Sequence, residues 1–252
     1  MGVTDPVPTA SPTRSPGLVL FVVSAAVFLS ALDLLIVNIA FPTLSAEFDA
    51  STVALSWVLN GYTIVFAALL APAGRTADRI GRRRVFLAGL GTFLVGSLGC
   101  ALAWDVGSLI AFRVVQAVGG AMVTATSLAL LLVAFPPARR AQAIAVWSMV
   151  GGVAAALGPP IGGVLVEVSW RWIFLVNIPV GIVALVVGLR VLPESKDDSE
   201  TRRPDLVGTV LLVLSVGLLA YALVDAPERG WASGSTPVAV TRTTRGASPT
   251  CW

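Results

Sequence analysis

The chain has 252 residues, of which 56% are apolar and 12% are charged, and 24 are glycines. Soluble proteins carry about twice this share of charged residues, so the composition argues against a water-soluble domain and places much of the surface in a lipid bilayer. The sequence has no histidine, which excludes histidine-based catalytic triads and histidine-ligated metals. Its two cysteines, Cys100 and Cys251, form no CxxC motif.

Seven apolar stretches have the length of a membrane-spanning helix, about 18 residues or more. In chain order they cover 17–41, 53–73, 85–104, 107–134, 141–166, 172–192 and 206–224. None shows strand-like alternation, and a helix satisfies its own backbone hydrogen bonds in lipid. The sequence therefore predicts an all-α integral membrane protein, in which 17–192 form a six-helix bundle and 206–224 form a seventh span.

The segments outside these spans are polar. Residues 1–16 are rich in Pro, Ser and Thr and predict a disordered cytoplasmic tail, and 193–205 predict a charged cytoplasmic loop. Residues 225–252 contain no apolar run of span length and carry Arg242 and Arg245. They predict an irregular tail that does not continue the architecture before it.

Basic residues are concentrated in alternate connections between the spans. Connections 74–84, 135–140 and 193–205 carry Arg or Lys, whereas 43–52 and 104–106 carry only acidic charge. Because basic loops stay in the cytoplasm, the N-terminus is predicted inside, in a multi-pass protein of the cell membrane. Four tryptophans fall at the outer ends of spans, at the headgroup level that amphipathic rings prefer: Trp57, Trp104, Trp170 and Trp172.

Two charged residues lie inside predicted spans, Asp33 in the first and Arg113 in the fourth. Each costs about 2.5–3.5 kcal/mol at membrane depth, which calls for a partner or a function. Asp33 precedes Pro42 by nine residues and Arg113 follows Asp105 by eight, so both lie about 12–14 Å below the outer face. If spans one and four are neighbours, we expect them to pair as a proton-coupled switch; a permanent structural ion pair is the alternative.

The connection from Gly74 to Arg84 reads GRTADRIGRRR. Its composition alone indicates a stop-transfer signal and an anchor for anionic lipid, and its place between two spans argues against nucleic-acid binding. Its arrangement suggests more, because Gly74 permits close helix approach and Asp78 must be held by an arginine or a helix N-terminus. The candidate gating residues are Gly74, Asp78, Arg79, Gly81, Arg82 and Arg83.

The fifth span contains the segment GGVAAALGPPIGG at 151–163. Prolines remove backbone donors and kink a helix, and glycines four residues apart let another helix pack closely. Ordinary tight packing and a specific conformational role are both compatible with this pattern, whose key residues are Gly158, Pro159, Gly162 and Gly163. The phosphate-binding motif GxxxxGK[ST] is absent from the chain.

Together these segments resemble the major facilitator superfamily, in particular its 14-helix branch of drug:proton antiporters. LDLLIVNIAFP at 32–42 is similar to the first-helix signature of that branch, and the loop from Gly74 to Arg84 to the superfamily loop motif. RVVQAVGGA at 113–121 resembles the fourth-helix motif and LGPPIGG at 157–163 the antiporter motif. SWRWIFLVNIPVG at 169–181 is also typical of the branch.

The resemblance implies a fold of 3+3 inverted repeats in each six-helix half and export of hydrophobic or cationic compounds against inward proton flow. By matching position, Asp33 and Arg113 would couple protons, and Asp78 with its arginines would form the gating loop. Asn38 and Gln116, in the same two helix motifs, are the candidate substrate-binding residues. No cofactor or metal is implied, since the proton gradient supplies the energy.

The chain departs from the superfamily in length, because a second six-helix half is expected and the sequence stops just past its seventh span. The irregular tail looks like an out-of-frame ending of a truncated gene. We therefore expect the N-terminal half of an exporter, with the bilayer, a small substrate, and a missing C-terminal half or a second copy as partners. The alternative is a non-transporting remnant or an assembly partner for a full-length homologue. An intramembrane enzyme is disfavoured, since histidine, a GxSxG motif and paired intramembrane carboxylates are absent.

Overall fold

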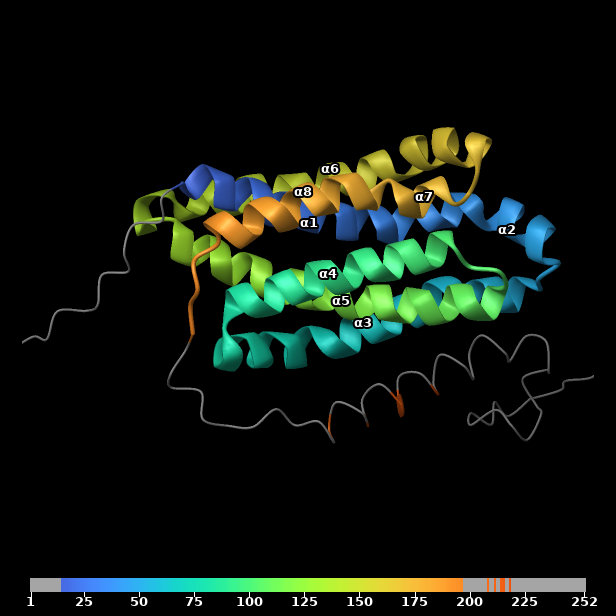
Figure 1. Cartoon of the computed structure of the whole chain (residues 1–252), viewed down its shortest axis with the longest axis horizontal. Helices are drawn as coiled ribbons and strands as arrows, with labels where there is room; N and C mark the ends of the chain where they lie inside the picture. Colours follow the sequence, from blue (N-terminus) through green and yellow to red (C-terminus); the bar gives the residue numbers. More distant parts are fainter. Residues whose placement is uncertain (1–14, 197–207, 209–210, 212–213, 216–217, 219–252) are drawn as a thin grey trace, which may run out of the picture.

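The computed structural model describes residues 15–196 together with 208, 211, 214, 215 and 218. In this part of the chain all regular structure is helical (Figure 1). The elements are α1 (Pro16–Ile36), the 3-10 turn η1 (Val37–Ala40), α2 (Phe41–Phe48), α3 (Thr52–Ile80), α4 (Arg82–Ala101), α5 (Val106–Ala134), α6 (Pro137–Val168), α7 (Trp172–Leu175) and α8 (Asn177–Val191).

Six of the seven predicted spans are confirmed as helices long and apolar enough to cross a membrane. The first is the continuous path of α1, η1 and α2, and the sixth joins α7 to α8. The seventh prediction, 206–224, lies largely outside the described residues, and the five of its residues that are described are helical. Of the predicted tail at 1–16, residues 1–14 lie outside the described residues and Pro16 begins α1. The predicted tail at 225–252 also lies outside the described residues.

Three predicted connections are wrong in extent, because the helices continue through most of them. Helix α2 runs through 43–48, α3 continues to Ile80 so that Gly81 alone separates it from α4, and α6 begins at Pro137. The hydropathy pattern marks only the part of a helix that lipid covers, whereas charged residues such as Arg and Glu are good helix formers in water. Each helix therefore extends beyond the apolar stretch that predicted it.

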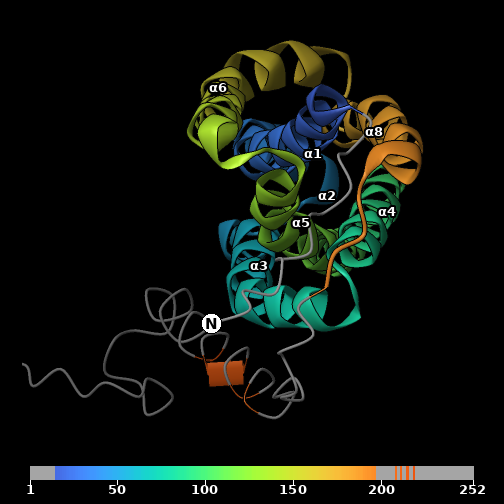
Figure 2. The ribbon, with the colours of Figure 1, turned by 90° about the vertical axis from the view of Figure 1, so that its left-hand side faces the viewer.

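The helices form two groups of three, seen end-on in Figure 2. Helix α5 packs against α3 and α4, and α1 packs against α6 and α8. The groups meet chiefly where α1 contacts α5 and α4 contacts α8. Spans one to three and spans four to six are packed in the same way. The first span of each set packs against the second and third spans of the other set: α1 against α6 and α8, and α5 against α3 and α4. This arrangement is the one expected of 3+3 inverted repeats.

Close packing between α4 and α5 depends on glycines. A Cβ atom at Gly119 would lie 2.6 Å from the carbonyl oxygen of Gly89 and would collide with the backbone of Phe93. A Cβ atom at Gly96 would lie 2.6 Å from the backbone nitrogen of Gln116. Small residues at such crossings let helix backbones approach in lipid, and here they bring Gln116 of α5 against α4.

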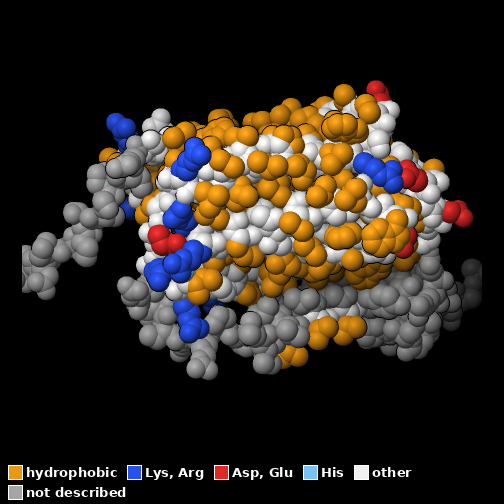
Figure 3. Space-filling model, in the orientation of Figure 1, with side chains coloured by type: hydrophobic (Ala, Val, Ile, Leu, Met, Phe, Trp, Pro, Cys, Tyr) orange, Lys and Arg blue, Asp and Glu red, His pale blue; other side chains and the backbone are white. Residues whose placement is uncertain are grey.

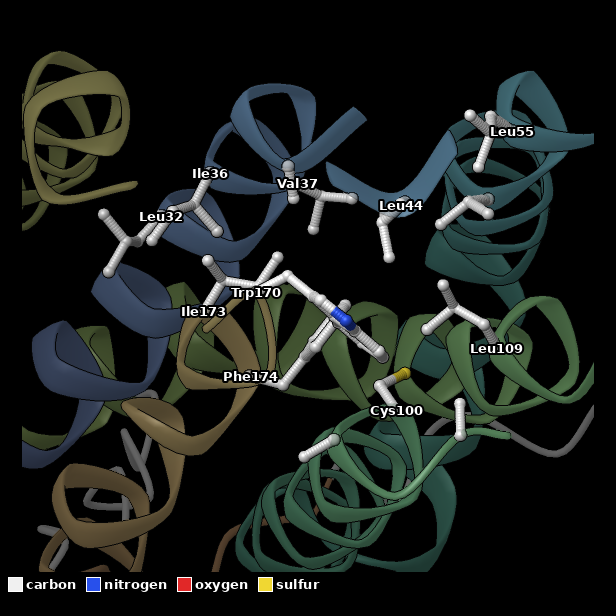
Figure 4. Packing of buried hydrophobic residues seen from close by; sticks show 14 of the residues in the cluster. Leu32, Ile36, Val37, Leu44, Leu55, Cys100, Leu109, Trp170, Ile173 and Phe174 are labelled. Carbon is white, nitrogen blue, oxygen red and sulfur yellow. The ribbon is translucent and has the colours of Figure 1, made fainter. Parts of the chain in front are cut away.

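A buried apolar cluster fills one end of the bundle, where Trp170 and Phe174 pack beside Cys100 and Leu109 (Figure 4). Trp170 is only 1% exposed, and its Nε1 donates a hydrogen bond of 2.6 Å to Oε2 of Glu47. It lies at the predicted end of its span, but it packs inside the protein and not at the lipid surface. Trp104, at 72% exposure, is accessible as the prediction requires.

Candidate functional site: a buried ion pair

The two charged residues predicted to pair do so at the centre of the bundle. Asp33 comes from α1 and Arg113 from α5, and Arg113 Nη1 donates to Asp33 Oδ2 in a direct ion pair. Neither side chain is exposed at all. The contact between α1 and α5 brings them to one level, as their positions in the spans predicted, and it places both charges where water cannot screen them.

The carboxylate of Asp33 receives further hydrogen bonds from two amides. Gln116 Nε2 donates to Oδ1 over 2.8 Å and Asn177 Nδ2 over 3.2 Å. The hydroxyl of Ser97 lies 2.7 Å from Gln116 Nε2 and 3.3 Å from Asn177 Nδ2, and Gln116 Oε1 accepts from Arg113 Nη1 over 2.7 Å. The carboxylate therefore faces only donors, contributed by α5 and α8, which is the environment that an ionised aspartate requires.

Arg113 also contacts helix α3. Its Nε donates to the carbonyl oxygen of Val58 over 3.3 Å, and its guanidinium carbon lies 4.1 Å from the ring centroid of Tyr62. The ring of Phe174 lies on another side of the guanidinium, at 5.9 Å. Arg113 Nη2 has no hydrogen-bond partner among the described residues. Because α1, α3, α4, α5 and α8 all contribute, a change of charge at Asp33 would act on five helices.

Sequence reasoning missed two members of this network, Asn177 and Ser97. Asn177 interrupts the apolar sixth span within LVNIPVG, so a polar side chain at membrane depth could have indicated it. Ser97 has no such signal, because serine is common in membrane helices and needs no partner outside its own helix.

The two substrate-binding candidates occupy different environments. Gln116 is fully buried, and its side chain is used by the network around Asp33. Asn38 is exposed in η1, where its Nδ2 donates to the carbonyl oxygen of Leu35 over 3.3 Å. Substrate contact by either residue stays a prediction.

The predicted gating residues surround the turn between α3 and α4. Asp78 is held by an arginine, as predicted, since Arg82 Nε donates to its Oδ1 over 2.8 Å. Gly81 breaks the helical path with φ of +119°, a conformation that other residues rarely adopt. Arg79 is exposed, and Gly74 packs only loosely against α5, since a Cβ atom there would lie 4.0 Å from that of Ala125.

This turn is tied to the segment that follows α8. The backbone nitrogen of Arg82 donates to the carbonyl oxygen of Ser195 over 3.0 Å, and Arg84 lies 3.5 Å from a carboxylate oxygen of Glu194. Arg83 Nη2 donates to the carbonyl oxygen of Leu189. The predicted loop is thus a structured turn that joins both helix groups; its role as a gate stays a prediction.

Two of the three glycines in the predicted antiporter segment pack against α1. A Cβ atom added at Gly158 would lie 3.1 Å from Cβ of Leu35, and one added at Gly162 would lie 2.9 Å from Cγ1 of Ile36. Gly163 has open space around it. Helix α6 continues through Pro159 and Pro160, so the close packing is confirmed for Gly158 and Gly162, and a conformational role is untested.

A sequence profile of the Major Facilitator Superfamily matches residues 23–242. The chain belongs to this superfamily. Its helices, its relatives and this membership together make it a multi-pass membrane protein and not an enzyme.

Relatives within the superfamily include proteins of drug resistance. The chain is 39% identical over 217 residues to the tetracenomycin C resistance and export protein of Streptomyces glaucescens, covering 86% of this chain and 40% of that protein. It is 38% identical to the multidrug resistance protein Stp of Mycobacterium tuberculosis, covering 89% of this chain and 42% of that protein. It is 37% identical to the methylenomycin A resistance protein of Bacillus subtilis, covering 91% of this chain and 49% of that protein. The chain thus spans less than half the length of these relatives.

Solved structures of the superfamily share the fold. A crystal structure of the peptide transporter POT in complex with sulfate superposes with a TM-score of 0.65 at 16% sequence identity, covering 87% of this chain and 49% of that one. At this identity the likeness shows the fold alone. The predicted superfamily fold of the six-helix bundle is therefore confirmed.

Proposed function

We propose that this protein forms the N-terminal half of a proton-coupled exporter of hydrophobic or cationic drug-like compounds. The observation that carries the proposal is the fully buried ion pair of Asp33 and Arg113, with the amides of Gln116 and Asn177 also donating to the carboxylate. Ionisable groups inside a membrane protein mark ion pathways and proton relays. The relatives named for drug resistance and export support the substrate class and the direction of transport.

The distribution of charge supports a cytoplasmic N-terminus. On the face shown in Figure 3, most Lys and Arg side chains lie at one end of the bundle, a smaller basic group lies beside acidic side chains near the other end, and an apolar band covers the middle. The basic turn of Gly81 to Arg84 lies at the end where α1 begins, and the opposite end carries Glu47 and Asp105. Positive residues near spans stay in the cytoplasm, so the arginine-rich end would face inward.

In this mechanism a proton binds one carboxylate oxygen of Asp33 and removes its negative charge. The hydrogen bond from Arg113 Nη1 then loses its anionic acceptor, and Arg113 is left as an uncompensated buried charge, which is costly. The helices rearrange to a second state in which Arg113 is compensated, and release of the proton on the other side restores the pair. Such a cycle couples proton entry to the movement of helices.

Transport in this fold uses a site near the midplane between two six-helix halves. We propose that a second half is supplied by further chain, by a separate polypeptide or by a second copy of this chain. The length of the relatives supports this view, because the chain spans less than half of each of them.

The test is export of a cationic dye from proteoliposomes under a proton gradient. The chain would be reconstituted alone, and also with the C-terminal half of the tetracenomycin C export protein, which the chain does not match. Asp33→Asn should abolish gradient-dependent export in each reconstitution that exports with the wild-type chain. Asp49→Asn is the control and should leave export unchanged. It makes the same change at an exposed residue whose φ of +46° asparagine tolerates. Export by Asp33→Asn at the wild-type rate would contradict proton coupling at this site, and export in neither arm would contradict the exporter proposal.

A further inference from the structure

A long apolar groove runs along α1 between α6 and α8, the two helices on either side of α1 in Figure 2. It encloses a cavity of about 440 Å³, lined by α1 from Gly17 to Phe28, by Val146 and Val150 of α6, and by Val180 of α8. Only Ser24 among the lining residues carries a polar side chain. Its volume is in the range of sites that hold small ligands, about 300–1,000 Å³, and its lining fits hydrocarbon.

A second cavity of about 370 Å³ adjoins the first at the arginine-rich end. The two share Gly17, Leu20 and Val146, and the second adds Arg139 and Gln142 near the start of α6. Arg139 is exposed, and its guanidinium forms no ion pair with any described residue. The groove is therefore apolar along its length and positively charged at its mouth.

The length of the groove matches one leaflet of a bilayer. From Gly17 to Phe28 the helix rises about 16 Å, which is half of a hydrocarbon core about 30 Å thick. Because α1 begins at Pro16, the mouth with Arg139 lies at the headgroup level and the apolar part lies beside the acyl chains. A molecule that fills both parts has one polar anionic end and one or more long hydrocarbon chains.

We propose that this groove binds an anionic phospholipid from the leaflet at the arginine-rich end. Its acyl chain lies on α1 between α6 and α8, and its phosphate contacts Arg139 and Gln142. Arginine forms strong charge-assisted hydrogen bonds with phosphate, and basic pockets between membrane helices recognise anionic headgroups. A hydrophobic cation fits less well, because the positive charge of Arg139 at the mouth repels it. Lipid binding at this groove is independent of transport and of Asp33.

Native mass spectrometry of the full chain, released from nanodiscs of equal parts phosphatidylglycerol and phosphatidylcholine with identical acyl chains, tests the proposal. Arg139→Gln removes the charge at the mouth, and Arg140→Gln is its matched control on the next residue, which lines neither cavity. Val146→Trp fills the part that both cavities share, and Met149→Trp is its control on an exposed position of the same helix. Circular dichroism confirms that each variant is folded.

We expect wild type to retain phosphatidylglycerol at least several-fold over phosphatidylcholine. Arg139→Gln should lower that ratio to near one and Val146→Trp should lower retention of both lipids, whereas both controls should behave as wild type. Equal retention of the two lipids by wild type would overturn the proposal, as would equal losses in a variant and its control. A dimer of the chain that Val146→Trp removes would assign the groove to a second copy. Displacement of the lipid by an added hydrophobic cation would assign the groove to a substrate. Either result would overturn the proposal.

Discussion

Replacing Asp33 by asparagine tests whether the buried pair stabilises the bundle. Among the described residues, Asp33 is the only counter-charge that Arg113 contacts, and the change removes it. It also replaces one carboxylate oxygen by an amide NH2 group in a site that faces donors from Arg113, Gln116 and Asn177. Removing one partner of a fully buried ion pair costs about 3–5 kcal/mol. We expect a loss of this size in the free energy of unfolding for Asp33→Asn, and a similar loss for Arg113→Gln.

The double variant Asp33→Asn/Arg113→Gln separates the pair from its surroundings. Both charges are then absent, and the two amides can bond each other and Gln116, so the double variant should be no less stable than either single variant. The coupling energy of the cycle is then at least about 3 kcal/mol. Unfolding of the full chain by SDS titration, followed by circular dichroism in mixed micelles, gives the four free energies.

Additive losses, within about 0.5 kcal/mol, would refute the reasoning, because they would show that the two charges do not stabilise each other. Export measured on the same four proteins distinguishes a structural pair from a coupling pair. If the double variant regains both stability and proton-driven export, Asp33 serves structure alone. If it regains stability without export, the titrating carboxylate is itself required.

Four further predictions concern the same measurement. Asn177→Leu should cost about 1–3 kcal/mol, because it removes a donor to the buried carboxylate; no loss would show that this amide is dispensable. Gly119→Ala should destabilise the crossing of α4 and α5 by about 1–3 kcal/mol, whereas Gly152→Ala, with open space around it, should change stability by no more than about 1 kcal/mol. Gly81→Ala should cost about 1–3 kcal/mol through its positive φ, and an unchanged midpoint would contradict this. Hydrogen bonds from the backbone and side chain of Ser108 lower the pKa of Asp105. The stability that ionised Asp105 adds is therefore present above the unfolded pKa of about 3.9 and is lost as the pH falls through the lower folded pKa. The stability difference between wild type and Asp105→Ala should shrink in acid.

The sequence predicted well those features that depend on one helix at a time. Hydropathy located six spans, and the positions of Asp33 and Arg113 within their spans predicted that they would be level. The prediction of their pairing needed one assumption, that spans one and four are neighbours, and the contact of α1 with α5 meets it. The arginine that holds Asp78 was predictable because it lies four residues away on a continuous helical path.

Features that depend on the mutual arrangement of several helices were not predictable from one sequence. Ser97 joins the network only because the glycines at the α4–α5 crossing bring it to Gln116. Gly163 looks equivalent to Gly162 in the segment LGPPIGG, but it points about 100° further around the helix, and a Cβ atom there would meet no atom within 4 Å. Trp170 has the sequence position of an interfacial tryptophan, yet its indole is buried and donates a hydrogen bond to Glu47. In each case a neighbour distant in sequence decides the outcome.

The location of the polar network connects the fold to the proposed coupling. The two helix groups meet chiefly through the α1–α5 and α4–α8 contacts, and the network places Asp33 on α1, Gln116 on α5, Ser97 on α4 and Asn177 on α8. These are the same four helices. The groups are also joined at the arginine-rich turn, where Arg84 lies 3.5 Å from a carboxylate oxygen of Glu194, but that ion pair is partly exposed, whereas Asp33 and Arg113 are fully buried. Under the proposed coupling, the ionisation state of Asp33 would therefore strengthen or weaken the buried part of the junction. Under the proposed coupling, a proton arriving at this carboxylate would therefore act first on the fit between the two inverted repeats of this half.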